Sequence, residues 1–351
     1  MATFETHITH NRRISTLLIL SLSVFVCLLS GVIALSLSES GAERAYAVFA
    51  QGAGWGAALA AFGAIVSFFW GGNLITAICG GYRIQPHDDK ALFNIVEEMS
   101  IAAGLPIPDI YIIHDETPNA FASGRNPEHA LIAITTGLRK KLNREELQAV
   151  IAHEMSHIKN YDILTMMFVA VFAGVVVLIS DFFLRSYMHS IHLKWHKKQG
   201  ARILTLKKGW WYTIGTLIAA LFLSWMAPLF ALLLQLAVSR KREYLADATA
   251  VQLCRNPLAL ASALKKIALD PGALQCDNRA TEPMFIVNPH PLRRMAHYRD
   301  ESIWATHPPV IQRIARLRAL AHEYPQPETK FEGLEEDNEL EFVLEPPQSP
   351  V

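Results

Sequence analysis

The chain has 351 residues and carries 32 lysines and arginines against 32 aspartates and glutamates, so its formal net charge at pH 7 is zero. This balance removes any argument from overall charge for a nucleic-acid partner, and we expect none. Hydrophobic residues make up 51% of the chain and are bunched into long blocks. That pattern favours a membrane protein, in contact with a lipid bilayer, over two ordinary soluble domains.

Two uncharged blocks near the N-terminus predict a membrane hairpin over residues 1–82. The first block, 14–38, follows two arginines and exceeds the roughly 7–15 apolar residues of a cleavable signal peptide, so we expect an uncleaved anchor. The second, 45–82, is rich in glycine and alanine and easily exceeds the roughly 20 residues that cross a bilayer. The predicted spans are about 14–38 and 55–80.

A second apolar pair, at 163–180 and 210–238, predicts another membrane hairpin over 162–238. Both blocks are uncharged, so we expect four membrane helices in all. The first block of this pair is at the lower end of the spanning length. Core helices of a large soluble domain therefore stay open as an alternative for this pair.

The segments on either side of the second hairpin have the composition of a globular α+β domain in two halves, 83–161 and 239–324. The remaining end, 325–351, is rich in proline and acidic residues. We expect it to be a disordered, solvated tail.

Local patterns predict the elements of the two halves. Apolar residues at helical spacing predict a helix over 92–105, and β-rich runs predict strands over 108–115 and 130–138. Helical periodicity returns at 239–268 and at 307–323.

The four cysteines form no CxxC pair, and their spacing is typical of neither a disulfide framework nor a thiolate metal site. We therefore expect them to be reduced packing residues. They are Cys27, Cys79, Cys254 and Cys276.

The stretch LNREELQAVIAHEMSH predicts a helix that carries possible metal ligands on one face. Asn143 can cap it, with Glu146 at the third position completing a capping box. His153 and His157 are four residues apart, so both imidazoles can reach one metal ion, and Glu154 lies beside the first. This is the HExxH pattern, in which the glutamate takes a proton from a metal-activated water. The alternative is two histidines on a solvated helix face.

A catalytic zinc needs a third protein ligand. The best candidate is in SRKREYLADATAV, where Glu243 and Asp247 are four residues apart on a helical pattern. Glu243 would bind the metal, and Asp247 would hold a histidine N–H behind it. Surface ion pairs with the basic residues 240–242 are the alternative for these acids.

The motifs HEMSH, SRKREYLADATAV and THPPVIQRIARL, with an apolar hairpin between the first two, resemble the HtpX and CAAX-prenyl-protease family of integral-membrane zinc metallopeptidases. The resemblance implies a mainly α membrane protein whose α+β zincin-like protease domain is split by the second helical hairpin. It also implies one Zn²⁺ per chain, bound by His153, His157 and Glu243, with Glu154 as general base and Asp247 supporting a ligand.

The same resemblance implies a substrate site. The run PNAFASGRNPEHALIAITTGL is similar to the family's substrate-side strands, so the backbone of Asn119, Ala120 and Phe121 is expected to pair with an extended peptide. His307 of THPP is similar to a family histidine near the active site, where it would stabilise an oxyanion. A simple turn residue before Pro308 is an equal alternative.

Two departures from the family pattern limit what can be carried over. Gln312 stands where an acid is expected before Arg313, which puts an ion pair there in doubt. The segment 270–305 is longer than a minimal HtpX-like linker and contains NPHPLRRM, so no substrate preference is transferred.

Membrane orientation and a rival histidine cluster complete the predictions. Basic residues before the first span favour a cytoplasmic N-terminus and catalytic domain in a multi-pass protein of the bacterial inner membrane. The basic loop at 189–208 opposes this, unless the second hairpin only dips into the bilayer. His189, His192 and His196 in that loop could bind a metal, although an interfacial segment explains their aromatic and basic neighbours better.

The predicted function is a membrane-embedded zinc endopeptidase that cleaves protein or peptide substrates, membrane proteins among them, in quality control. One alternative is a zinc-containing scaffold or chaperone that no longer hydrolyses peptides, which Glu154 opposes because a structural site needs no base. Another is an enzyme restricted to prenylated C-termini. The sequence gives no oligomeric state.

Overall fold

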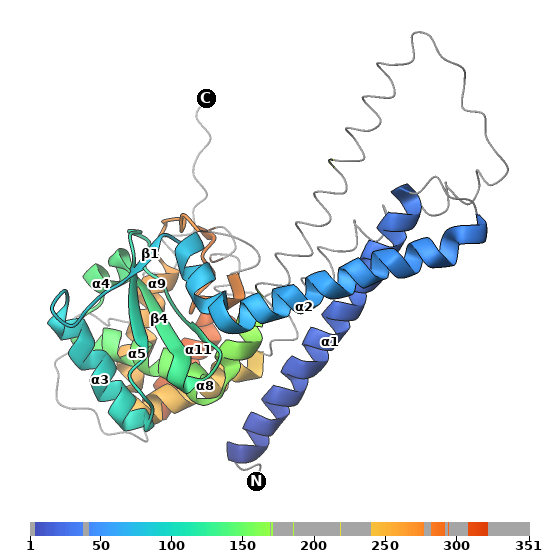
Figure 1. Cartoon of the computed structure of the whole chain (residues 1–351). Coiled ribbons are helices and arrows are strands. Elements are labelled where there is room, and N and C mark those ends of the chain that lie inside the picture. The colour runs from blue at the N-terminus through green and yellow to red at the C-terminus, as the bar shows by residue number, and fades with distance from the viewer. Residues whose placement is uncertain are drawn as a thin grey trace, which may run out of the picture.

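The computed structural model describes residues 4–37, 42–168, 240–276, 282–291 and 308–321, together with the single residues 170, 185, 218 and 294. These residues are mostly helical and form a globular α+β domain with two long helices projecting from one side (Figure 1). Four of the predictions fall outside them: the bodies of both helices of the second hairpin, the histidine cluster at 189–196, His307 and the tail.

The projecting helices are α1 (Phe4–Leu37) and α2 (Ala45–Ile78), joined through the short helix η1 (Ala42–Arg44). They pack closely because glycines of α2 face α1: a Cβ added at Gly52 would lie 2.8 Å from the Ser30 carbonyl oxygen, and one at Gly56 would lie 2.9 Å from the Val26 carbonyl oxygen. Small residues at such a crossing are typical of membrane helix pairs.

Among the described residues, α2 is the one helix that is long and apolar enough to cross a bilayer, and α1 contributes a shorter apolar stretch over Ile19–Leu35. The finding is compatible with the first hairpin. Four membrane helices and a protease domain split by the second pair are not established by it.

A four-stranded sheet in the order β1-β2-β4-β3 forms the centre of the domain. The central pair β2 and β4 is parallel, while β1 and β3 run antiparallel at the two edges. The strands are β1 (Gly81–Arg83), β2 (Asp109–Ile113), β3 (Ala120–Gly124) and β4 (Ala130–Thr135).

Helices from both sequence halves cover the sheet (Figure 1). The first half supplies α3 (Lys90–Ala103), the short η2 (Pro127–His129), α4 (Thr136–Lys141) and α5 (Arg144–Lys159). The second half supplies α8 (Arg240–Cys254), α9 (Pro257–Ala268), η4 (Glu282–Met284) and α11 (Val310–Ala321).

The two faces of the sheet belong to different clusters of buried residues. Ile110, Ile112 and Ile132 pack with residues of the helices α3, α5 and α9. Their neighbours along the same strands, Ile113 and Leu131, pack with residues of α2 instead. Because both faces are covered, these strands read as continuous apolar runs.

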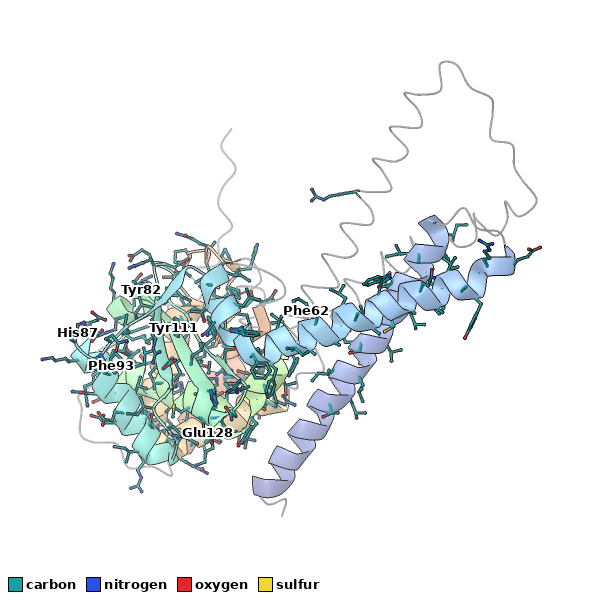
Figure 2. The ribbon with its side chains drawn as sticks, viewed as in Figure 1. Phe62, Tyr82, His87, Phe93, Tyr111 and Glu128 are labelled. Carbon is teal, nitrogen blue, oxygen red and sulfur yellow. A yellow bond between two sulfur atoms is a disulfide. The ribbon has the colours of Figure 1, made fainter. Side chains whose placement is uncertain are left out.

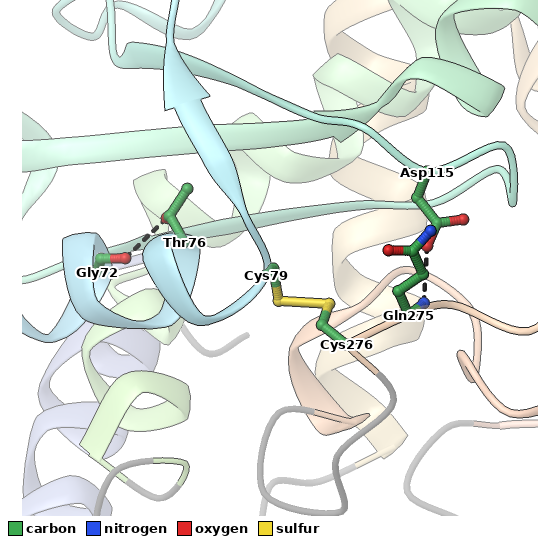
Figure 3. The surroundings of a disulfide bond; sticks show 6 residues. All are labelled: Gly72, Thr76, Cys79, Asp115, Gln275 and Cys276. Carbon is green, nitrogen blue, oxygen red and sulfur yellow. Dashed lines mark hydrogen bonds between the residues drawn. A yellow bond between two sulfur atoms is a disulfide. The ribbon is translucent and has the colours of Figure 1, made fainter.

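The expectation that all four cysteines are reduced was wrong for two of them. Cys79, at the end of α2, forms a disulfide with Cys276, which lies 197 residues further along the chain (Figure 3). Cys27 and Cys254 are free. The spacing of the cysteines does not predict this bond. The bond forms because the fold brings the start of β1 beside the segment that follows α9.

Most predicted elements of the domain are confirmed. The helices expected at 92–105 and 307–323 are α3 and α11, and the strand expected at 108–115 is β2. The strand expected at 130–138 is β4, but it ends at Thr135, which caps the unpredicted helix α4. The region 239–268 holds two helices, because Asn256 caps a new helix that starts at Pro257. β1 was not predicted.

Candidate metal centre

Helix α5 is a fixed platform for the HExxH residues. Its start has the predicted capping box, in which Asn143 and Glu146 each accept a hydrogen bond from the other's backbone N–H. Glu146 also accepts bonds from Ser262 and Lys266 of α9. The side chains of Val150 and Ile151 are fully buried behind the histidines. Capping and burial leave the helix little freedom to rotate.

His153, His157 and Glu243 meet in the interior, each offering one ligand atom, with all three atoms within 4.8 Å of one another. The two histidine Nε2 atoms are 3.2 Å apart. They lie 3.7 Å and 3.6 Å from the two Glu243 carboxylate oxygens. Tetrahedral metal bonds of about 2.0–2.2 Å separate ligand atoms by about 3.3–3.6 Å. The three residues therefore fit one tetrahedral cation, with a fourth position for water.

Asp247, which was expected to support a histidine ligand, lies behind His153. Its Oδ1 is 3.0 Å from His153 Nδ1. Arg313 of α11 binds the same carboxylate through two hydrogen bonds of 2.7 and 2.8 Å, and its side chain is fully buried. The Asp247 carboxylate keeps the pKa of Arg313 raised against the opposing effect of burial. The acid that bonds Arg313 is therefore Asp247 rather than a residue at position 312, and Gln312 accepts a hydrogen bond from Tyr244.

His157 has a matching partner that sequence reasoning missed. Its Nδ1 is 3.2 Å from Asp162 Oδ2, and Arg242 lies 3.4 Å from the other oxygen of Asp162. Asp162 can turn back because Tyr161 has a positive φ of 59°, which is rare for a residue other than glycine. A carboxylate five residues beyond the second histidine was the available signal.

Glu154 is buried beside the two histidines, and its Oε1 has no hydrogen-bond partner among the described residues. Burial raises the pKa of Glu154 to about 7, partly opposed by the positive field of His157. A carboxylate with a pKa near neutrality is suited to accepting a proton and later returning it. Its position next to the ligand atoms suits it to act on a molecule bound in the fourth position.

The charges around the site suit a bound cation. Four buried carboxylates, Glu154, Asp162, Glu243 and Asp247, face two buried guanidinium groups, Arg242 and Arg313. With neutral imidazoles and all four carboxylates ionised, the described cluster carries two more negative than positive charges, which is costly in an interior. Without a cation, Asp162 and Glu243 raise the pKa of His157 to about 9 despite its burial. A divalent ion would replace that proton, because metal binding requires the neutral ring.

The expected substrate strand lies beside this centre. Asn119 directly precedes β3, the edge strand that contains Ala120 and Phe121. The backbone N–H of Ala122, one residue further on, partly offsets the raised pKa of Glu154. In this structure the chain's own residues 286 and 287 bond to Ala120 and Asn119. His307 is outside the described residues, so the structure assigns it no place.

Comparison with known proteins places the chain in a family. The family model for peptidase family M48 matches residues 86–321, two thirds of the chain and all of the described catalytic elements after β1. The chain belongs to peptidase family M48. It is therefore a metalloprotease, and its substrates are proteins or peptides. The match spans both sequence halves, including the helices that carry the HExxH residues and Glu243.

Individual M48 relatives are similar over most of their length. A protease HtpX homolog of Thermoanaerobacter pseudethanolicus is 44% identical over 71% of this chain and 78% of its own. Homologs from Tropheryma whipplei and Bacteroides fragilis are 40% and 35% identical, over 76% and 72% of this chain and 84% and 76% of theirs. Together with the apolar helix α2, these relatives indicate a membrane protein.

Proposed function

We propose that this M48 protein is a membrane-embedded zinc endopeptidase, with the zinc held by His153, His157 and Glu243. The observation that carries the proposal is the buried cluster of two Nε2 atoms and one carboxylate within 4.8 Å, with Glu154 at its side. Two imidazoles and a carboxylate form a known catalytic zinc set, which keeps one position open for water. The zinc would supply a polarised carbonyl and a water of lowered pKa.

The chain's own residues would perform the remaining steps. Glu154 accepts the proton of the attacking water and delivers it to the amine that leaves. Asp247 and Asp162 fix the orientation of His153 and His157 through their Nδ1 atoms, 3.0 and 3.2 Å away. The free edge of β3 at Ala120 would hold the peptide by strand addition. The backbone N–H and C=O of Asn119 are bonded to Thr135 of β4, so Asn119 would contribute its side chain. His307 would contribute to the oxyanion site.

The test uses full-length protein purified in detergent and loaded with zinc. Wild type is expected to contain about one zinc per chain and to cleave casein. Glu154→Gln is expected to keep its zinc and lose activity by a factor of about 10² or more, since it removes the general base. Glu145→Gln on the same helix is the matched control and should cleave normally. Zinc-free wild type would overturn the proposal.

The alternative of a scaffold that does not hydrolyse peptides is not favoured. Its specific prediction is that zinc binds while neither wild type nor the Glu145→Gln control cleaves any protein substrate. A structural zinc is also usually enclosed by four protein ligands, and the described cluster offers three.

For the cellular setting, we propose a multi-pass protein of the bacterial inner membrane whose catalytic domain faces the cytoplasm and cleaves damaged membrane proteins. Arg12 and Arg13, which lie in α1 ahead of its apolar stretch Ile19–Leu35, support this orientation, and α2 leads directly into the domain. Labelling of cysteines introduced at 189–208 from outside the cell would test the second hairpin. The Cys79–Cys276 disulfide opposes a cytoplasmic face, because the cytoplasm keeps thiols reduced. The thiol state of this pair in the cell is therefore a second readout, and a bond that persists there would overturn the cytoplasmic orientation.

A further inference from the structure

A segment of the second sequence half lies along the edge of the proposed substrate strand. We name residues 284–288 the strap. The Ile286 N–H donates a hydrogen bond of 3.0 Å to the Ala120 carbonyl oxygen. The Asn119 side-chain N–H donates one of 2.9 Å to the Val287 carbonyl oxygen. The rings of Phe285 and Phe121 meet edge to face, with centroids 5.2 Å apart.

The strap bonds to the edge of β3 that faces away from β4. In a β-strand the N–H and C=O of one residue point to the same side, and alternate residues point to opposite sides. Ala120 bonds to Ile286 of the strap, and Arg313 binds both Ile286 and Asp247, so this edge lies beside the residues that support the metal centre. The opposite edge of β3 pairs with β4. One edge can hold one partner strand, so a peptide that binds here competes with the strap.

The strap is held at both ends. Asn288 bonds back to Glu282, closing a short loop. The buried Arg294 donates hydrogen bonds to the carbonyl oxygens of Pro289, at 3.1 Å, and Ile267, at 3.3 Å. The centre of the strap is tied to the metal centre, because Arg313 donates a 2.9 Å bond to the Ile286 carbonyl oxygen as well as binding Asp247. Ile286 thus lies between the substrate edge and the residues behind His153.

We propose that the strap is an internal pseudosubstrate: in the free enzyme it occupies the Ala120 carbonyl oxygen and the Asn119 side-chain amide, which a substrate peptide would take, and it withdraws when a peptide binds. This rests on the proposed function, which assigns those groups to substrate. The observed affinity for a peptide is then the intrinsic affinity reduced by the fraction of molecules with the strap withdrawn. The opposite reading is a permanent wall that positions Asn119 for binding.

The first test measures peptide binding without cleavage. Full-length, zinc-loaded Glu154→Gln protein is titrated with a dye-labelled ten-residue casein peptide. Adding Ile286→Pro removes the N–H that bonds Ala120, and the peptide should bind about two- to tenfold more tightly, the value of one hydrogen bond. Ile286→Val retains the N–H and should bind like its parent. Ile107→Pro, the same change in the loop before β2, controls for the introduced proline.

Three results would overturn the strap proposal. They are weaker binding after Ile286→Pro, an unchanged affinity, and the absence of binding in every variant, since a released edge must accept the peptide. Phe285→Ala is a second variant, used in case Ile286→Pro unfolds the strap locally. It keeps every backbone N–H of the strap and removes the ring contact with Phe121. It should also tighten binding. Zinc content is measured for each variant, so loss of the metal centre is recognised separately.

The second test follows the strap itself by hydrogen exchange. When the peptide binds to the Glu154→Gln protein, fragments covering 284–288 should exchange faster, because the Ile286 N–H loses its partner. A permanent wall would exchange at the same rate or more slowly. Failure of the proposed function can be told apart from failure of the strap proposal. It would appear as wild type without zinc, or as cleavage that does not depend on Glu154, and neither result depends on the strap.

Discussion

The catalytic domain and the helical hairpin place polar and apolar groups in opposite ways. The domain buries Glu154, Glu243 and Arg313 almost completely, each within reach of opposite charge. Helix α2 carries no charged residue and leaves Trp55 77% and Phe62 64% exposed. Phe62 lies on the part of α2 that extends beyond the domain (Figure 2).

The difference shows one chain adapted to two solvents. In water, exposed aromatic rings are costly and buried charges must be paired. In lipid, apolar side chains can face outward, and helices associate through close packing of small residues. The domain should therefore be sensitive to changes of charge, and the hairpin to changes of volume at its glycines.

The largest effect is expected at the charged interior of the domain. Arg313→Ala leaves Asp247 buried without its bidentate partner, which should lower the free energy of unfolding of the domain by about 3–5 kcal/mol. Arg316→Ala is the control on the same helix, because this exposed arginine only stacks on Tyr244. Denaturant unfolding in detergent measures both. Equal effects would show that burial of charge does not dominate the domain.

The pH dependence of cleavage tests the buried charge of Glu154 in the catalytic domain. Glu154 must be ionised to accept a proton, and burial raises its pKa to about 7. Activity should therefore fall as pH decreases through that pKa, approaching tenfold per pH unit on the acid side. A bound cation favours the ionised carboxylate and moves this limb to lower pH. Measurement of kcat/KM from pH 5 to 8 tests it, and activity that rises toward acid would contradict the assigned base.

Volume should matter most in the hairpin. Gly56→Leu forces a side chain against Ser30 and the Val26 carbonyl oxygen, which should weaken the association of α1 with α2 by about 1–3 kcal/mol. Gly54→Leu adds the same side chain where nothing lies within 4 Å, and should be tolerated. Cross-linking between cysteines placed on the two helices reports the packing. If both variants behave alike, α1 and α2 do not pack in this register.

The smallest effect is expected on the outer face of α2. Trp55→Ser removes an exposed ring and should change the unfolding free energy of the domain by less than about 0.5 kcal/mol. Partition of the protein into vesicles should decrease. A domain destabilised by this change would mean that Trp55 packs against protein rather than lipid.

Local features of the sequence predicted the parts of the site that lie within one helix. The start of α5 follows from Asn143 and Glu146, and the shared face of His153 and His157 follows from their spacing. Asp162 was missed because its approach to His157 depends on the left-handed turn at Tyr161. The roles of Glu243 and Asp247 could be predicted only together with the distant HExxH motif, because a metal bound by His153 and His157 needs a third ligand.

Contacts between distant segments could not be predicted from the sequence. The strap meets β3 across more than 160 residues, and no local periodicity records such a partner. The same holds for Arg313, whose partner Asp247 lies 66 residues earlier in the chain. Tertiary packing decides these contacts, whereas capping and periodicity are decided by neighbouring residues.

The Cys79–Cys276 bond closes a covalent ring of the chain that contains both α5 and α8 (Figure 3). A protease that cuts the connection between these helices, for example within 189–208, would therefore leave the protein in one piece. The fragment with His153 and His157 would remain attached to the fragment with Glu243. Electrophoresis would show a single species without reductant and two with it. A cleaved enzyme would therefore keep its three metal ligands together for as long as the disulfide is intact.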